Sequence, residues 1–300
     1  MSRRAVALFA LMSVVWGIPY LLIKVAVRHL GPVEIVEART LLGAALLLPL
    51  AIRQGRMRPL LAAWRPLVAY CVCELAIPWY LLSSAERRIS SSLSGLLVAS
   101  VPLVSALLAY MGGHGNVLGR RGMVGLFVGL AGVGVLLGLD VHAAQAGAVA
   151  QVLVVSVGYA VGPYIAARYL DDQSGLALAA TSLAMVAVAY MPAAAVGLPG
   201  TVPPATVIAS LVVLGVVCTA VAFVAFFELI REVQPTRATL ITYFNPLIAV
   251  VLGVVVLGEP FRLSTAVGFG LILGGSRLAA GRGRNRETGR SAAAVRQPPG

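Results

Sequence analysis

The chain has 300 residues, of which 59% are hydrophobic and 11% charged, and its formal net charge is +12. A soluble domain has about 25% charged and about 45–50% apolar residues, so this composition excludes an ordinary soluble globular fold. The cations lie between apolar runs or near the C-terminal end, not in a basic stripe interleaved with aromatic side chains, which argues against a nucleic-acid partner.

Apolar runs, each close to the roughly 20 residues that cross a bilayer, follow one another along the chain. The first, residues 5–27, follows Arg3 and Arg4 and so has the start of a secretory signal, but it is long enough to span and contains Trp16 and Pro19. We predict that it is the first of about ten transmembrane helices. The ten runs are residues 5–27, 33–52, 67–84, 93–111, 123–139, 146–167, 176–196, 206–227, 238–257 and 264–278.

The cationic residues between these runs predict the orientation. With ten spans and an internal N-terminus, 17 Lys and Arg residues fall on the cytoplasmic side and 5 on the other, with Arg39 inside a span. We therefore expect a multi-pass protein of the cell membrane with both termini in the cytoplasm. Residues 282–300 contain too few apolar side chains to form a core, so we predict that they are a disordered basic cytoplasmic tail.

Cysteine and histidine spacing predicts neither a metal site nor a bound cofactor. Cys71, Cys73 and Cys218 all lie in apolar runs, and Cys71 and Cys73 point to different faces of a helix. The three histidines fall in different connections without ligand spacing. The cysteines are interpreted as small packing residues.

The sequence contains an internal repeat at an offset of 144 residues. Pro19 falls on Pro163, Lys24 on Arg168, and Pro102 on Pro246. Five spans is an odd number, so a second copy enters the membrane inverted relative to the first, which is a recurrent construction in secondary transporters. We predict two inverted five-helix repeats, residues 1–139 and 146–281.

Three stretches of the chain resemble a known family. They are WGIPYLLIKVA from Trp16, EARTLLGAALLL around Arg39, and TRATLITYFNPLIAVVLGVVVLGEPF from Thr236, followed by GFGLILGG. Together they resemble the EamA-type transporters of the drug/metabolite transporter superfamily, nearly to Leu278. The resemblance implies two EamA-like repeats, export, and coupling to protons or to a counter-substrate. The first half departs from the pattern, because Gly115 stands where Glu259 stands in the second.

An ionisable side chain in hydrocarbon costs at least a few kcal/mol, so each one inside a span is a candidate for function. Glu74 is the deepest, in the middle of the third run. It is either a proton-carrying or substrate-binding carboxylate, or a protonated or locally paired group that only packs.

Glu37, Arg39 and Lys24 are further candidates for the substrate or proton pathway. Glu37 and Arg39 are two residues apart, point to different faces of one helix, and need not pair. Arg39 could bind an anionic group of a substrate, or hold a carbonyl or Glu37 from a neighbouring helix. Lys24 lies at the outer end of the first span, where snorkelling is a sufficient explanation, although the family pattern also has a lysine there.

Prolines inside spans remove backbone hydrogen bonds and kink helices. Pro19, Pro102, Pro163 and Pro246 are therefore candidate hinges, with kinks needed only for packing as the competing interpretation. Several aromatic side chains lie at depths where they either line an amphipathic cavity or pack in the core. These candidate residues for the substrate pathway are Trp16, Trp79, Tyr80 and Tyr164. Among the neutral polar residues, Asn245 is the strongest candidate for the same pathway.

Glycine-dense runs predict close helix contacts. The stretches GLFVGLAGVGVLLG and GFGLILGG carry small residues at helical spacing, which is typical of helices whose backbones approach within a membrane. We expect the helices that contain them to pack tightly.

The sequence favours a secondary transporter that moves a small metabolite, amino acid or drug-like solute by alternating access. Export is favoured over import. It contains no nucleotide-binding P-loop, which argues against primary transport. The alternative is an integral membrane enzyme acting on a lipid or isoprenoid. Such an enzyme would need carboxylates or histidines clustered at one depth, and here they are scattered. We therefore predict that the protein is not an enzyme.

Overall fold

A computed structural model describes residues 2–55, 57–111, 120–140, 145–198, 200–233 and 241–280. The predicted tail, residues 282–300, and Gly115 lie outside these residues. Every regular element in the described part of the chain is a helix. Seven helical stretches are long and apolar enough to cross a membrane: Arg3–Ala26, Pro32–Arg53, Trp64–Glu86, Ser91–Met111, Ala146–Tyr169, Gly175–Val196 and Ala205–Glu232. The prediction of an all-α membrane protein is therefore confirmed.

Three further helices occupy the remaining predicted runs. They are α9 (Arg120–Asp140), α15 (Ile241–Leu257) and α16 (Leu263–Ala280). The helices at Ile241–Leu257 and Leu263–Ala279 are apolar but shorter than a full candidate span. The apolar runs of the sequence thus give the positions of the helices to within a few residues.

Two of the seven stretches are broken near a proline. The first divides into α1 (Arg3–Val15) and α2 (Pro19–Ala26), with Pro19 as the first residue of α2. The fourth divides into α7 (Ser91–Val98) and α8 (Val101–Met111), with Pro102 as the second residue of α8. A proline lacks the N–H that an interior position must donate, and at a helix start that donor is not needed. Pro19 and Pro102 therefore lie in the first turn of a helix, whereas the sequence predicted kinks inside helices.

Two other stretches contain a π-helical segment. The third runs through α5 (Trp64–Tyr70), η1 (Cys71–Ala76) and α6 (Ile77–Glu86). The seventh runs through α12 (Ala205–Val212), η4 (Val213–Val221) and α13 (Ala222–Glu232). Segments of this type are rare and frequently lie at functional sites. An offset of 144 residues carries η1 onto residues 215–220, inside η4.

The chain forms two compact units. Unit 1 comprises Met1–Val98 and His142–Phe261, and unit 2 comprises Ala99–Val141 and Arg262–Gly300. Each unit draws on both halves of the sequence, so these units are not the two predicted repeats.

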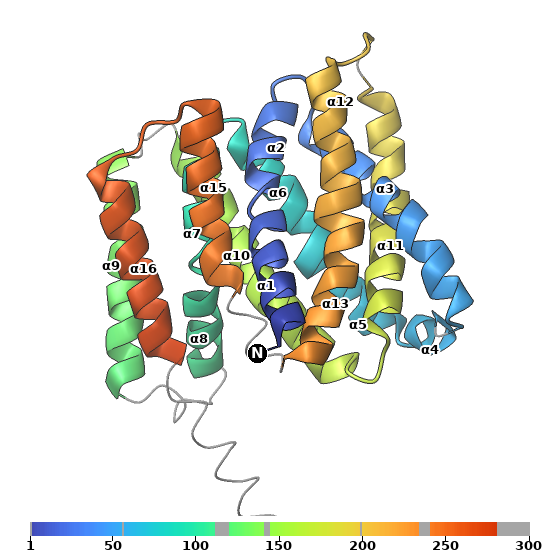
Figure 1. The fold of residues 1–300 in the computed structure, drawn as a ribbon, viewed down its shortest axis with the longest axis horizontal. Helices are drawn as coiled ribbons and strands as arrows, with labels where there is room; N and C mark the ends of the chain where they lie inside the picture. The colour runs from blue at the N-terminus through green and yellow to red at the C-terminus, as the bar shows by residue number, and fades with distance from the viewer. Residues whose placement is uncertain are drawn as a thin grey trace, which may run out of the picture. The chain divides into compact units, whose positions relative to one another are not determined.

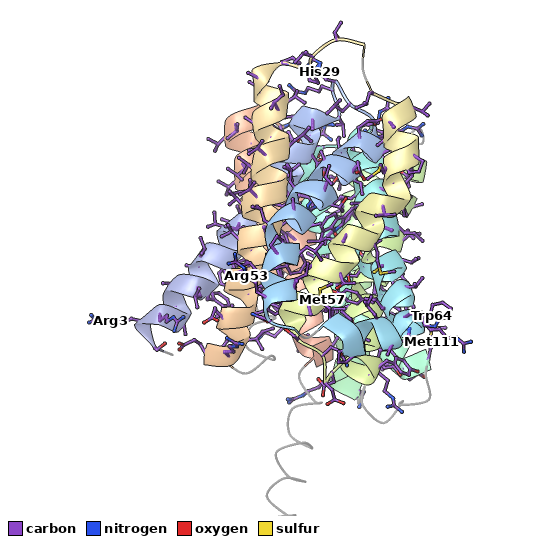
Figure 2. All side chains as sticks on the ribbon, turned by 90° about the vertical axis from the view of Figure 1, so that its right-hand side faces the viewer. Arg3, His29, Arg53, Met57, Trp64 and Met111 are labelled. Atoms are coloured by element: carbon purple, nitrogen blue, oxygen red, sulfur yellow. The ribbon has the colours of Figure 1, made fainter. Side chains whose placement is uncertain are left out.

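Within unit 1, antiparallel helices pack around an apolar interior. Helix α3 (Pro32–Arg53) packs against α11 (Gly175–Val196), α10 (Ala146–Tyr169) packs against α6, and α15 packs against α7. The short helix α4 (Met57–Ala62) follows α3 at one end of the unit. His29 lies towards one end of the unit and Arg3 and Trp64 towards the other (Figure 2). The first span and α3 therefore run in opposite directions.

Unit 2 is held together by helices that approach closely at glycines. Helices α9 and α16 lie side by side, with α8 against both (Figure 1). A Cβ atom at Gly132 would lie 2.8 Å from the Gly268 carbonyl oxygen, and one at Gly125 would lie 2.6 Å from that of Gly275. Only glycine permits this backbone separation, so the predicted close packing of the two glycine-dense runs is confirmed.

Candidate functional site

Arg39 is held inside unit 1 by a threonine and a tryptophan. Its side chain, on α3, is 8% exposed. Its Nε donates to Thr219 Oγ1 of η4 at 2.9 Å, and its guanidinium carbon lies 3.6 Å from the centroid of the Trp79 ring. The Thr219 hydroxyl donates its one proton to the Leu214 carbonyl at 2.8 Å, so its lone pairs face Arg39. One edge and one face of the guanidinium are thereby fixed.

The charge of Arg39 has no carboxylate partner among the described residues. The ion pairs of Arg4 and Arg231 with Glu228 and Glu232 lie elsewhere and do not involve Arg39. Arginine stays protonated in proteins, and burial of an ion carries an effective penalty of several kcal/mol. A desolvated cation–π contact returns about 2 kcal/mol, and a hydrogen bond to a charged group about 1.5–3 kcal/mol. Stacking and the threonine therefore offset only part of the cost of a buried cation.

The groups around Arg39 come from several elements of unit 1. Tyr159 of α10, Cys218 of η4 and Tyr20 of α2 all lie within electrostatic range of its charge. The Trp79 side chain of α6 also lies beside the Tyr159 hydroxyl. We call Arg39, Trp79, Thr219, Tyr20 and Tyr159 the arginine cluster. It combines one charge, aromatic surface and three hydroxyl groups inside a helical unit.

Glu74 lies next to the arginine cluster without pairing with Arg39. Its Oε2 atom is buried and has no hydrogen-bond partner. A Cβ atom at Gly162 of α10 would collide with this carboxyl group, so Glu74 packs directly against the glycine. Tyr159 interacts electrostatically with Glu74 as well as with Arg39. A carboxyl oxygen that is buried without a hydrogen-bond partner favours the neutral form of its group, so this side chain can hold a proton.

Lys24 occupies a different place from Arg39 and Glu74. Its Nζ donates to the Glu86 carbonyl oxygen at 2.6 Å and to that of Ile89 at 2.7 Å. Glu86 is the last residue of α6 and Ile89 lies just beyond it, so the ammonium group sits at the C-terminal end of this helix, where a cation is favourable. Snorkelling is therefore only part of the explanation, because Lys24 also caps a helix.

Glu86 is a buried ionisable residue that the sequence analysis missed. It is 0% exposed, and neither carboxylate oxygen has a hydrogen-bond partner. Lys24 and Glu259 interact with it electrostatically, and Tyr20 interacts with it in turn. The only signal in the sequence is a glutamate in the last turn of a span, where water is ordinarily expected to solvate it.

Glu259, the marker of the family resemblance, caps a helix. Its carboxylate accepts hydrogen bonds from the backbone N–H groups of Ser91 and Ser92, at 2.8 and 3.0 Å, and from both serine hydroxyls. Partial burial raises the pKa of the Glu259 carboxyl, but these four hydrogen bonds outweigh it, and the pKa lies below its ordinary value. The GEP turn that presents it begins at Gly258, whose φ of +67° favours glycine.

The predicted aromatic residues divide between core and surface. Trp16 packs against Phe226, with ring centroids 4.8 Å apart, and against Phe223 at 6.3 Å. Tyr80 is 36% exposed and lies 6.5 Å from the ring of Tyr190. Tyr164 is 62% exposed. Of the four, Trp79 stacks against the guanidinium of Arg39.

Asn245 and Glu37 lie inside unit 1 with different partners. With its amide nitrogen towards the carbonyl oxygens, Asn245 donates to Ser13 at 3.1 Å and to Ile241 at 3.0 Å, and so ties α15 to α1. Glu37 is 9% exposed, and its buried Oε2 has no hydrogen-bond partner. The structure therefore gives Arg39 the partners Thr219 and Trp79 in place of Glu37.

The two remaining candidate hinges lie inside helices. Pro163 lies within α10 and Pro246 within α15, and Pro246 is buried. Pro163 directly follows Gly162, against which Glu74 packs. Each proline leaves a carbonyl group without its helical donor, which is where a helix bends most easily.

Comparison with known proteins gives matches along nearly the whole chain. The model of the EamA-like transporter family matches residues 3–138 and again residues 147–280. The "Uncharacterized inner membrane transporter YedA" of Escherichia coli K12 is 29% identical over 275 residues, covering 89% of this chain and 87% of that protein. An "Uncharacterized transporter" of Archaeoglobus fulgidus is 22% identical over 267 residues, with coverages of 88% and 94%. A solved crystal structure matches with a TM-score of 0.64 and 18% identity over 92% of this chain and 96% of its own.

Proposed function

Because the chain belongs to the EamA-like transporter family, we propose that it is a secondary exporter of a small metabolite, amino acid or drug-like solute. The family is one of transporters, both named relatives are called transporters, and the one from Escherichia coli is called an inner membrane transporter. The apolar helices agree with a multi-pass protein of the cell membrane. The observation that carries the proposal is the arginine cluster, with Glu74 beside it. A charged group that costs free energy inside a membrane protein is best explained by an interaction with a solute or ion.

Alternating access between two inverted five-helix repeats is the mechanism that we propose. Two observations support it. The family model matches the chain twice, at residues 3–138 and 147–280. The π-helical segments η1 and η4 also correspond at the 144-residue offset, and they carry Glu74 and Thr219 of the candidate site. The same local departure from α-helical geometry thus occurs at equivalent positions of both halves.

In this mechanism Glu74 carries a proton and the helix interruptions are the hinges. A proton taken up by Glu74 removes a buried charge, so the protonated and ionised states favour different surroundings. Pro19 and Pro102 lie in the first turn of a helix after a break, and Pro163 and Pro246 weaken α10 and α15. These are the positions where one set of helices can move against another at the lowest cost.

The orientation that we propose has both termini in the cytoplasm. The 17-to-5 distribution of cationic residues between the predicted loops supports it. A reporter fused after Gly300 should be active in the cytoplasm, and activity on the outer side would contradict the orientation.

An efflux screen tests the transport function. Cells that overproduce the protein and cells that lack it are loaded with amino acids, organic acids or cationic drugs, and the retained solute is measured. We expect faster loss of at least one class in the overproducing cells, and restored retention with Arg39→Gln at equal abundance. Equal retention of every solute in both cell types would contradict the proposal.

A further inference from the structure

The guanidinium of Arg39 has one side that the protein does not use. Its Nε edge donates to Thr219, and one of its faces stacks on Trp79. Among the described residues, no hydrogen bond or ion pair involves its Nη1 or Nη2 atoms. These two atoms form the fork that binds a carboxylate through two parallel hydrogen bonds. Stacking on Trp79 fixes the plane of this fork in advance.

From this geometry we propose that Arg39 binds the carboxylate of a transported solute whose remaining body is apolar or aromatic. The inference rests on the transport function proposed above and names the class of solute. Thr219 and Trp79 orient the guanidinium, and the Nη atoms hold the solute.

The charge balance favours a single carboxylate over a phosphate. Arg39 contributes one positive charge, and the nearest interacting groups, Tyr159, Cys218 and Tyr20, add no second cation. A monoanion therefore neutralises the site, whereas a dianionic phosphate would leave a buried negative charge. Lys24 is already committed to the carbonyl oxygens of Glu86 and Ile89.

The walls of the site explain why the rest of the solute should be apolar. Trp79 is 5% exposed and Tyr20 is 6% exposed, so both present ring surface inside the unit. Binding sites for small molecules commonly combine such surface with a few oriented polar groups. A small carboxylate such as acetate could bind the Nη atoms of Arg39 but would be too short to pack against the rings of Trp79 and Tyr20.

The inference can be tested by binding to the full-length protein in lipid nanodiscs. The probes are 3-phenylpropionate, its neutral amide 3-phenylpropionamide, and acetate, and the measurement is the ligand-dependent rise in apparent melting temperature. We expect 3-phenylpropionate to raise the melting temperature. The amide and acetate should bind at least tenfold more weakly, as judged from the concentrations needed for the same rise. Equal stabilisation by acid and amide, or none by the acid, would overturn the inference without any variant.

Two variants and a matched control locate the binding site. Arg39→Gln removes the charge, and Arg39→Lys keeps it but removes the fork. Loss of a charge-assisted hydrogen bond should weaken binding by about 10- to 100-fold in both. Arg53→Gln, at the exposed end of the same helix, should bind like the native protein. Unchanged binding by Arg39→Gln would overturn the inference.

The binding result and the transport result are separable. Selective binding of the acid at Arg39 without efflux of any solute would contradict the transport function and leave the carboxylate site intact. Efflux of solutes with no preference for the acid over the amide would contradict the carboxylate site alone.

Discussion

Glu259 accepts two hydrogen bonds from Ser92, one from the backbone N–H at 3.0 Å and one from the hydroxyl at 2.5 Å. Ser91 donates a second pair of hydrogen bonds to the same carboxylate, from its backbone N–H and its hydroxyl. Glu259 lies in the turn that follows α15, and its carboxylate thus accepts from N–H groups at the start of α7. A helix start needs such acceptors, and an anion there also interacts favourably with the helix dipole. The residue that marks the family resemblance is therefore explained by structure.

Removing the Glu259 carboxylate should destabilise the protein. We expect Glu259→Ala to lower the free energy of unfolding by about 1–2 kcal/mol, as the loss of a helix cap does, and Glu259→Gln to lower it less. The control is Glu232→Gln, because Glu232 is exposed and its ion pair with Arg4 is worth about 0–1 kcal/mol. Thermal unfolding in lipid nanodiscs measures the difference.

The same carboxylate predicts a dependence on pH. The pKa of Glu259 is lowered in the folded protein, so its contribution to stability is present above the unfolded pKa and is lost as the pH falls through the folded pKa. The difference in stability between the native protein and Glu259→Gln should therefore shrink on acidification below the ordinary carboxyl range. A difference that stays constant at low pH would show that the charge does not act through this cap.

Replacement of Lys24 should affect folding more than transport chemistry. Lys24→Met removes two hydrogen bonds near the end of α6 and a cation that interacts with Glu86, so we expect the free energy of unfolding to fall by about 2 kcal/mol or more. Arg28→Met, at an exposed position in the same connection, is the control. If Lys24 instead bound solute, flux would fall while the melting temperature stayed near its native value.

Hydropathy predicted the helical membrane fold because burial in lipid leaves a strong signal in each run. The partners of individual polar groups could not be predicted in the same way. Arg39 had Glu37, a carbonyl group or a solute as equally plausible partners, and the choice of Thr219 depends on how α3 packs against η4. The π-helical segments were also missed, because hydrophobic periodicity assumes 3.6 residues per turn throughout.

The boundary of a span was the second source of error. Glu86 ends the third stretch, where a sequence gives no means to tell a solvated glutamate from one that neighbouring helices cover. Glu259 was recognised as a marker, but Ser91 and Ser92 lie far away in the sequence. Both cases depend on contacts between distant segments, which one sequence without homologues does not reveal.

The packing of Glu74 against Gly162 can be measured by a double-mutant cycle. Gly162→Ala places a methyl group into the Glu74 carboxyl group and should cost about 1–3 kcal/mol. In a Glu74→Ala background most of this cost should disappear, since the two residues are in contact. Gly147→Ala on the same helix meets no atom within 4 Å and serves as the control. Equal costs in both backgrounds would contradict the contact.

If Glu74 carries protons, its charge state and flux must be linked. Glu74→Gln keeps the size of the side chain and cannot ionise, so we expect a folded protein whose flux no longer depends on pH. Abundance and melting temperature are compared with those of Glu232→Gln, which changes a carboxylate at an exposed position. A pH dependence like that of the native protein would remove Glu74 from the mechanism.

Alternating access is the central claim, and Cys218 tests it most directly. This residue is 1% exposed, precedes Thr219, and interacts with Arg39. The chain has three cysteines, so Cys71→Ala with Cys73→Ala leaves Cys218 as a single target. A membrane-impermeant maleimide is applied to oriented vesicles from either side. We predict slow labelling of Cys218 from both sides, whereas labelling from one side only, or from neither, would contradict the account.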